Sequence, residues 1–167
     1  MINNVIFLDI DGVLNSKFWN ESHQMEISDG TLIDQKNIKL LAELVNKTGA
    51  KIVLHSGWKM WFDANLKPLR NESERLVNML NDVGLSIYDV TPDLATEEIR
   101  RSKKFSLVKA DEIILWLKLH EEVTEWIVID DLDLHNELIG SHQIKTDSRV
   151  GLTMEDVEAA MKLLNRG

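Results

Sequence analysis

The segment VIFLDIDGVLN, residues 5–15, begins as a continuous apolar run and ends with two closely spaced carboxylates. An apolar run such as residues 5–8 is typical of a β-strand that is covered on both faces. Asp9 and Asp11 follow at the end of that strand, and Gly12 permits a tight turn after them. Two like charges beside a buried strand repel each other, so the pair needs a cation or a proton to balance it.

The rest of the chain alternates between expected strands and expected helices. Further short apolar strands are expected at residues 51–56, 85–90, 126–130 and 143–145, and helical spacing of apolar residues occurs at 38–45, 76–80, 113–117 and 157–164. Repeated strand-then-helix order predicts an α/β fold in which a parallel sheet of about five strands lies between two layers of helices. In such a sheet, ligands bind beyond the carboxyl ends of the strands.

Composition excludes several classes of protein. The 167 residues contain no repeat and no linker-like segment, so we expect one domain over residues 1–167. The net charge of −9 argues against an extended nucleic-acid-binding surface. The absence of cysteine excludes thiolate catalysis and cysteine-bound metals in this chain. No apolar run approaches the ~20 residues of a membrane span and no signal peptide is recognised, so we expect a cytoplasmic protein without a membrane partner.

Three of the expected strands end in groups that suit a binding site. These are Asp9 and Asp11, Ser56 and Gly57, and Asp130 and Asp131. Each pair has a simpler explanation as a turn, a helix N-cap or a solvated loop, but those explanations do not account for their shared position at strand ends. If the strands are neighbours, up to four carboxylates converge and repel one another. A hard divalent cation would offset this repulsion, and magnesium fits oxygen ligands of this kind best.

Two of these segments resemble motifs of the haloacid dehalogenase-like (HAD) phosphohydrolases. FLDIDGVLN is similar to the first motif of that family and WIVIDD to the fourth, while Ser56 takes the place of the second-motif Ser/Thr. Lys109, in KADEIILWL, is the best match to the third-motif lysine, and Lys103, Lys104 and Arg101 remain alternatives. Together with HSGWK, the Thr91-Pro92 pair and VGLT, the chain is similar over nearly its whole length to the HAD domain of "Swiss Army Knife" RNA repair proteins.

The resemblance implies a three-layer α/β/α Rossmann-like HAD core and a Mg²⁺-dependent phosphomonoester hydrolase. Asp9 would be the nucleophile that forms an aspartyl-phosphate, and Asp11 would be first the general acid and then the general base. Ser56, the Gly57 amide and Lys109 would bind the substrate phosphate. The expected metal-binding residues are Asp9, Asp11 (through its main-chain carbonyl), Asp130 and Asp131.

The substrate is less well defined by the sequence. Residues 12–33 and 89–108, where family members carry cap insertions, are too short for a full cap, so we expect little or no cap domain and an open site. A nucleotide or nucleic-acid end is the favoured phosphorylated substrate. The alternatives are a phosphatase of a small-molecule monophosphate, a phosphotransferase, and a non-catalytic phosphate-binding module. The oligomeric state is left open.

Trp19, Trp58 and Lys59 are candidate substrate contacts, although Trp58 is also explained by packing on the core. His55 is expected to be structural and to point away from the Ser56 side.

Overall fold

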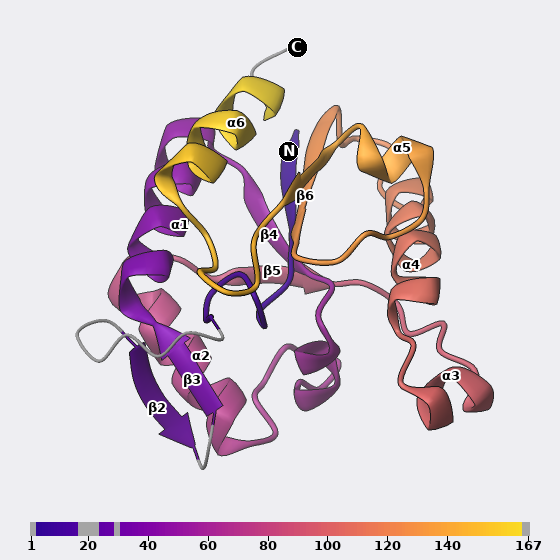
Figure 1. Cartoon of the computed structure of the whole chain (residues 1–167), viewed down its shortest axis with the longest axis horizontal. Coiled ribbons are helices and arrows are strands. Elements are labelled where there is room, and N and C mark those ends of the chain that lie inside the picture. Colours follow the sequence, from indigo (N-terminus) through magenta and orange to yellow (C-terminus); the bar gives the residue numbers. More distant parts are fainter. Residues whose placement is uncertain (1–2, 17–23, 29–30, 165–167) are drawn as a thin grey trace.

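A five-stranded parallel sheet with strand order β5-β4-β1-β6-β7 forms the centre of the computed structural model, which describes residues 3–16, 24–28 and 31–164 (Figure 1). The strands are β1 (Asn4–Leu8), β4 (Lys51–Leu54), β5 (Ile87–Val90), β6 (Glu125–Asp130) and β7 (Gln143–Lys145). Each lies where the sequence predicts a strand. The predicted α/β fold with a five-stranded parallel sheet is therefore confirmed.

Helices cover both faces of this sheet (Figure 1). They are α1 (Gln35–Thr48), α2 (Asn71–Asp82), α3 (Glu97–Ser102), α4 (Ser106–Lys118), α5 (Glu137–Gly140) and α6 (Met154–Leu164), with a short 3₁₀ helix, η1 (Gly57–Trp61), after β4. Helices α1, α2 and α6 pack on one face, and α4 and α5 pack on the other. This is the expected three-layer arrangement.

The apolar run of β1 is continuous because both of its faces are buried. Ile6 and Leu8 belong to the hydrophobic cluster formed with α1, α2 and α6. Val5 and Phe7 belong to the cluster formed with α4 and α5. Successive side chains of a strand point to opposite faces, so a central strand covered by helices on both sides needs an apolar residue at every position.

Capping residues mark three helix ends. The Asp34 side chain caps α1 by accepting a hydrogen bond from Lys36 N, and Gly49 ends that helix with a φ of 68°. Before α6, Thr153 N donates to the Asp156 carboxylate while Asp156 N donates to Thr153 Oγ1, so the two residues form a capping box.

Two short insertions flank the sheet, and in their described residues neither forms a cap domain. An antiparallel hairpin of β2 (Gln24–Ser28) and β3 (Thr31–Asp34), which the sequence analysis did not predict, lies between β1 and α1. Helix α3 occupies the gap between β5 and α4.

Trp19, a candidate substrate contact, lies outside the described residues. Within the described part of the chain, no helix has the length and apolar character needed to cross a bilayer.

Trp116 provides a direct test of the packing on the α4 side. Its ring meets Phe7 edge-on at 5.3 Å between centroids, and its Nε1 donates to Asp89 Oδ2 at 2.8 Å. We expect Trp116→Ala to lower the free energy of unfolding by about 3–5 kcal/mol, measured by chemical denaturation. Leu107→Ala, at an exposed position of the same helix, should change it by no more than about 0.5 kcal/mol. Equal losses in the two variants would contradict this account of the core.

Candidate active site

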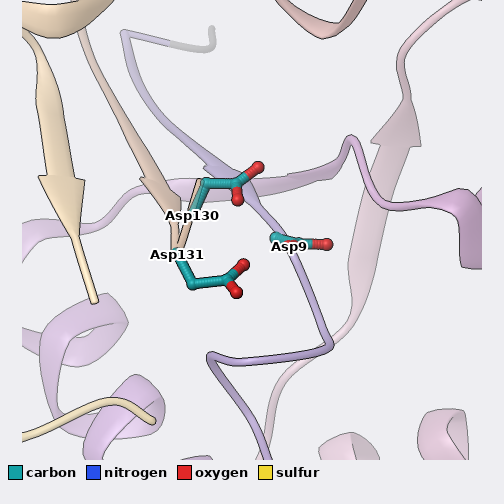
Figure 2. Close-up of side chains that lie close together, drawn as sticks. All are labelled: Asp9, Asp130 and Asp131. Carbon is teal, nitrogen blue, oxygen red and sulfur yellow. The ribbon is translucent and has the colours of Figure 1, made fainter. Parts of the chain in front are cut away.

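Three carboxylates meet at the carboxyl ends of the two central strands. Asp9 follows β1, Asp130 is the last residue of β6, and Asp131 comes next. Leu8 pairs with Ile129 in the parallel register of these strands, so their ends lie side by side. Each carboxylate offers an oxygen, and these oxygens lie within 4.8 Å of one another. Figure 2 shows Asp130 and Asp131 extending from the end of β6 toward the segment that carries Asp9.

Lys109 lies in the first turn of α4 and reaches this group of carboxylates. Its Nζ is 2.9 Å from Asp130 Oδ2 and 3.5 Å from Asp9 Oδ2. Burial alone would lower the pKa of Lys109, but the two carboxylates outweigh it and raise that pKa, so the side chain stays charged. The alternatives Arg101, Lys103 and Lys104 are all exposed, and of these Lys103 lines the same cavity.

Asp130 is held as a buried anion by its neighbours. His55 Nε2 lies 2.8 Å from Asp130 Oδ2, and the backbone amide of Leu132 donates to Oδ1 at 2.9 Å. Burial would raise the pKa of Asp130, but hydrogen bonds from His55 and Lys109 hold it far below its usual value. Burial lowers the pKa of His55, so the ring is neutral and Nε2 carries the proton that it donates.

The other two carboxylates lack such compensation. Burial raises the pKa of Asp9 well above its usual value, the Asp130 charge raises it further, and Lys109 opposes both effects only in part. Burial and the neighbouring Asp130 charge also raise the pKa of Asp131. The cluster therefore has more negative charge than its neighbouring cation balances.

Asp11 occupies a different environment from Asp9. Its exposed carboxylate accepts hydrogen bonds from Trp58 Nε1 at 3.1 Å and from Asn15 Nδ2 at 3.0 Å. Trp58 is only 4% exposed, so its ring packs on the hydrophobic core. Its Nε1 also orients the Asp11 carboxylate. The side chain of Asp11 is thus held at the mouth of the site, separate from the group formed by the other three carboxylates.

Gly12 is required by the turn that separates these two environments. Its φ is +82°, and a Cβ at this position would lie 2.5 Å from Asp131 Cγ. Any other residue would meet both a strained backbone and a clash. The Asp-Gly turn therefore lets Asp131 approach the end of β1.

A cavity of about 340 Å³ opens in front of Asp9. Its lining includes Asp9, Asp11, Ser56, Gly57, Lys109 and Asp131. The Ser56 hydroxyl accepts a hydrogen bond from Trp58 N at 3.2 Å. Ser56 is therefore the N-cap of η1, which is one of the two roles expected for it. Ser56 also lines the cavity, and so do Gly57 and Lys109, the other two residues expected to bind the substrate phosphate.

Lys59 does not face this cavity. Its buried Nζ lies 2.9 Å from Glu112 Oε1, and it donates to Thr91 Oγ1 at 3.1 Å and to the Pro92 carbonyl at 3.0 Å. These three partners use all three donors of the ammonium group. We therefore no longer assign Lys59 to substrate contact. Lys59 was a candidate because it lies among aromatic residues in GWKMW, and nothing in the sequence reveals its distant buried partner.

A family model described as "HAD domain in Swiss Army Knife RNA repair proteins" matches residues 5–157 of the chain. The chain belongs to this family of HAD domains. No curated protein is similar enough to match the chain. Membership of the family points to a phosphohydrolase type of function for this HAD domain, which agrees with the resemblance noted from its motifs.

The carboxylates of this HAD domain fit a hard divalent cation. Asp9, Asp130 and Asp131 supply only oxygen ligands, and the raised pKa values of Asp9 and Asp131 show that added positive charge would stabilise their ionised forms. Mg²⁺ prefers ligands of this kind. Because Lys109 balances part of the negative charge of these carboxylates, the cluster is suited to hold the cation that HAD domains typically use.

Asp9→Asn should stabilise the protein when no metal is bound. Because folding raises the pKa of Asp9, the stability of the wild type should fall as pH rises above about 4, where the unfolded chain releases this proton before the folded one does. Asp9→Asn removes this fall, so at pH 7 in EDTA its free energy of unfolding should exceed that of the wild type. Asp111→Asn, an equal charge change at an exposed position of α4, is the control.

Added Mg²⁺ should reverse this order of stability. At 100 times its Kd, a ligand of the folded state stabilises it by about 2.7 kcal/mol, and Asp9→Asn should lose most of this gain. Thermal denaturation with Mg²⁺ and with EDTA measures both effects. A variant that is less stable than the wild type in EDTA, or that gains equally from Mg²⁺, would contradict the charge balance described here.

Proposed function

We propose that this HAD domain is a Mg²⁺-dependent phosphatase that hydrolyses phosphomonoesters through an aspartyl-phosphate on Asp9. One observation carries the proposal. Asp9 lies buried in a group of three carboxylates with Lys109 beside it, while Asp11, two residues away, is held apart at the mouth of the same cavity. This arrangement supports one carboxylate as a nucleophile and another as a proton carrier.

In the first half of the reaction, the substrate phosphate enters the cavity beside Ser56, Gly57 and Lys109. An oxygen of Asp9 attacks phosphorus, the bond from phosphorus to the leaving oxygen breaks, and Asp11 gives its proton to that oxygen. Lys109 stabilises the charge on the phosphoryl oxygens as the bond breaks. Bound Mg²⁺ would supply positive charge that offsets the carboxylates and the transferring phosphoryl group.

In the second half, Asp11 acts as a base. It accepts a proton from a water molecule whose oxygen attacks the phosphorus of the aspartyl-phosphate, and the bond from phosphorus to the Asp9 oxygen breaks. Inorganic phosphate leaves, Asp9 is ionised again, and Asp11 carries the proton needed for the next cycle. Trp58 and Asn15 support this role because they fix the Asp11 carboxylate beside the cavity.

A second cavity, of about 270 Å³, supports a bulky leaving group. It is lined by Asp11, Asn15, Ser16, Thr31, Leu32, Trp58 and Trp61, so it begins at the residue that would protonate the leaving oxygen. The exposed Arg70 lies with its guanidinium 5.0 Å from the centre of the Trp61 ring. An aromatic wall with a cation beside it suits a nucleotide or the phosphorylated end of a nucleic acid.

The proposed chemistry predicts different effects at the two aspartates. In Mg²⁺, Asp9→Asn should abolish turnover of p-nitrophenyl phosphate, and EDTA should do the same to the wild type. Asp11→Asn should lower kcat with a natural, poorly leaving alcohol by roughly 10²–10⁴-fold, the range for general acid–base catalysis. Asp111→Asn is the matched control and should leave turnover unchanged. Activity that persists in Asp9→Asn would overturn the nucleophile assignment.

The same assays separate the alternatives. A wild type that binds phosphate but hydrolyses no member of a panel of phosphomonoesters would favour a non-catalytic phosphate-binding module. Transfer of the phosphoryl group to an added alcohol in preference to water would identify a phosphotransferase. Faster turnover of small-molecule monophosphates than of nucleotides or phosphorylated oligonucleotides would identify a small-molecule phosphatase.

Trp61→Ala tests the assignment of the leaving-group cavity. Stacking of a base on an aromatic side chain contributes about 1–3 kcal/mol, so kcat/KM for a phosphorylated oligonucleotide should fall at least ~5-fold, mainly through KM. Turnover of glycerol 3-phosphate, whose leaving group has no ring, should change little. Tyr88→Ala, at an exposed position of β5, is the control. Equal losses for both substrates would show that Trp61 only supports the fold.

A further inference from the structure

A buried ion pair lies directly behind the proposed phosphate-binding groups. Lys59 of η1 and Glu112 of α4 are 2.9 Å apart from Nζ to Oε1, and both side chains are more than nine-tenths buried. A cavity of about 220 Å³ is lined by Lys59 and Glu112 together with His55, Gly57 and Lys109. The cavity in front of Asp9 shares Gly57 and Lys109 with it, so the pair borders the site from the rear.

Each partner of the pair occupies a defined place relative to a phosphate-binding residue. Lys59 lies three residues after Ser56, within the short helix that Ser56 caps. Glu112 lies three residues after Lys109 on α4, and residues at this spacing share one face of a helix. The ion pair therefore ties the turn that presents Ser56 to the helix that presents Lys109.

The pair also fixes the segment that follows β5. Thr91 Oγ1 and the Pro92 carbonyl accept hydrogen bonds from Lys59, and the backbone amide of Leu94 donates to Glu112 Oε2 at 2.8 Å. All three donors of Lys59 and both oxygens of Glu112 are thus used. The two charges cancel locally, so neither side chain is left to attract the substrate phosphate.

Stability alone does not explain such a pair. The desolvation of two buried charges offsets much of their attraction, and apolar replacements are often as stable. What an ion pair with directional hydrogen bonds adds is a defined geometry. Because phosphoryl transfer depends mainly on positioning and charge stabilisation, a geometric constraint at this place bears on the reaction.

We propose that Lys59 and Glu112 are positioning residues that set the distance between the Ser56–Gly57 turn and the ammonium group of Lys109, and so shape the site for the phosphoryl group. This inference rests on the proposed function, because it assigns the phosphate to that cavity. It concerns residues that touch neither the substrate nor the metal-binding carboxylates.

Three variants test the proposal. Glu112→Gln keeps the shape of the side chain and removes its charge, Lys59→Met removes the ammonium, and the double variant Lys59→Met/Glu112→Leu leaves no buried charge unpaired. The double variant guards against simple unfolding, since apolar replacement of both partners preserves stability better than loss of one. Lys47→Met, which breaks the exposed Lys47–Glu43 pair on α1, is the control for the loss of a lysine charge.

Phosphate and Mg²⁺ binding are measured separately from catalysis. Calorimetry gives the Kd of inorganic phosphate in the presence of Mg²⁺ and the Kd of Mg²⁺ alone, and steady-state assays give kcat and KM. We expect Glu112→Gln and the double variant to bind phosphate roughly 10-fold more weakly and to lose roughly 10- to 100-fold in kcat/KM, as for small misplacements of reacting groups. Their affinity for Mg²⁺ and the behaviour of Lys47→Met should match the wild type.

Three results would overturn the proposal. A folded double variant with wild-type phosphate affinity and kcat/KM would show that the pair is only part of the core. A parallel loss of Mg²⁺ affinity in all three variants would show a general collapse of the site. If the wild type binds phosphate without hydrolysing esters, the proposed phosphatase function fails while the phosphate Kd still tests the positioning role. A wild type that binds no phosphate would overturn both.

Discussion

Three groups from separate parts of the chain converge on the buried carboxylate of Asp130. His55 comes from the end of β4, Lys109 comes from α4, and the amide of Leu132 comes from the loop after β6. A buried carboxylate is stable only when it is paired and hydrogen-bonded, so these contacts are a condition for Asp130 to end a central strand at all. They also hold Lys109 within 3.5 Å of Asp9. The geometry of the rest of the site follows from this arrangement.

The same concentration of charge links stability to function. Asp9 and Asp131 are unfavourable in the metal-free fold because burial and repulsion both act against their ionised forms. A protein selected only for stability would replace one of them, whereas the proposed reaction needs an ionised Asp9. Gly12 shows a similar constraint, since only a residue without a side chain allows Asp131 to approach so closely.

The sequence predicts most of the fold because its strongest signals are local. The apolar runs of the sequence predict all five strands of the sheet. The β2–β3 hairpin is not among the predicted elements, although Asp29-Gly30 between two short apolar–polar segments is a signal for such a hairpin. Contacts between distant segments, in contrast, leave no local signal. The bond from His55 to Asp130 crosses from β4 to β6, and the partner of Lys59 is known only once α4 is placed against η1.

The proposed reaction depends on transfer of the phosphoryl group to Asp9. A crystal structure of the protein with Mg²⁺ and beryllofluoride, which mimics a phosphoryl group on an aspartate, tests it most directly. We expect the adduct on a carboxylate oxygen of Asp9, with Mg²⁺ beside it at Asp130 or Asp131 and with Ser56 and Lys109 contacting the fluorines. An adduct on another aspartate, or a beryllofluoride bound with no bond to Asp9, would contradict the account.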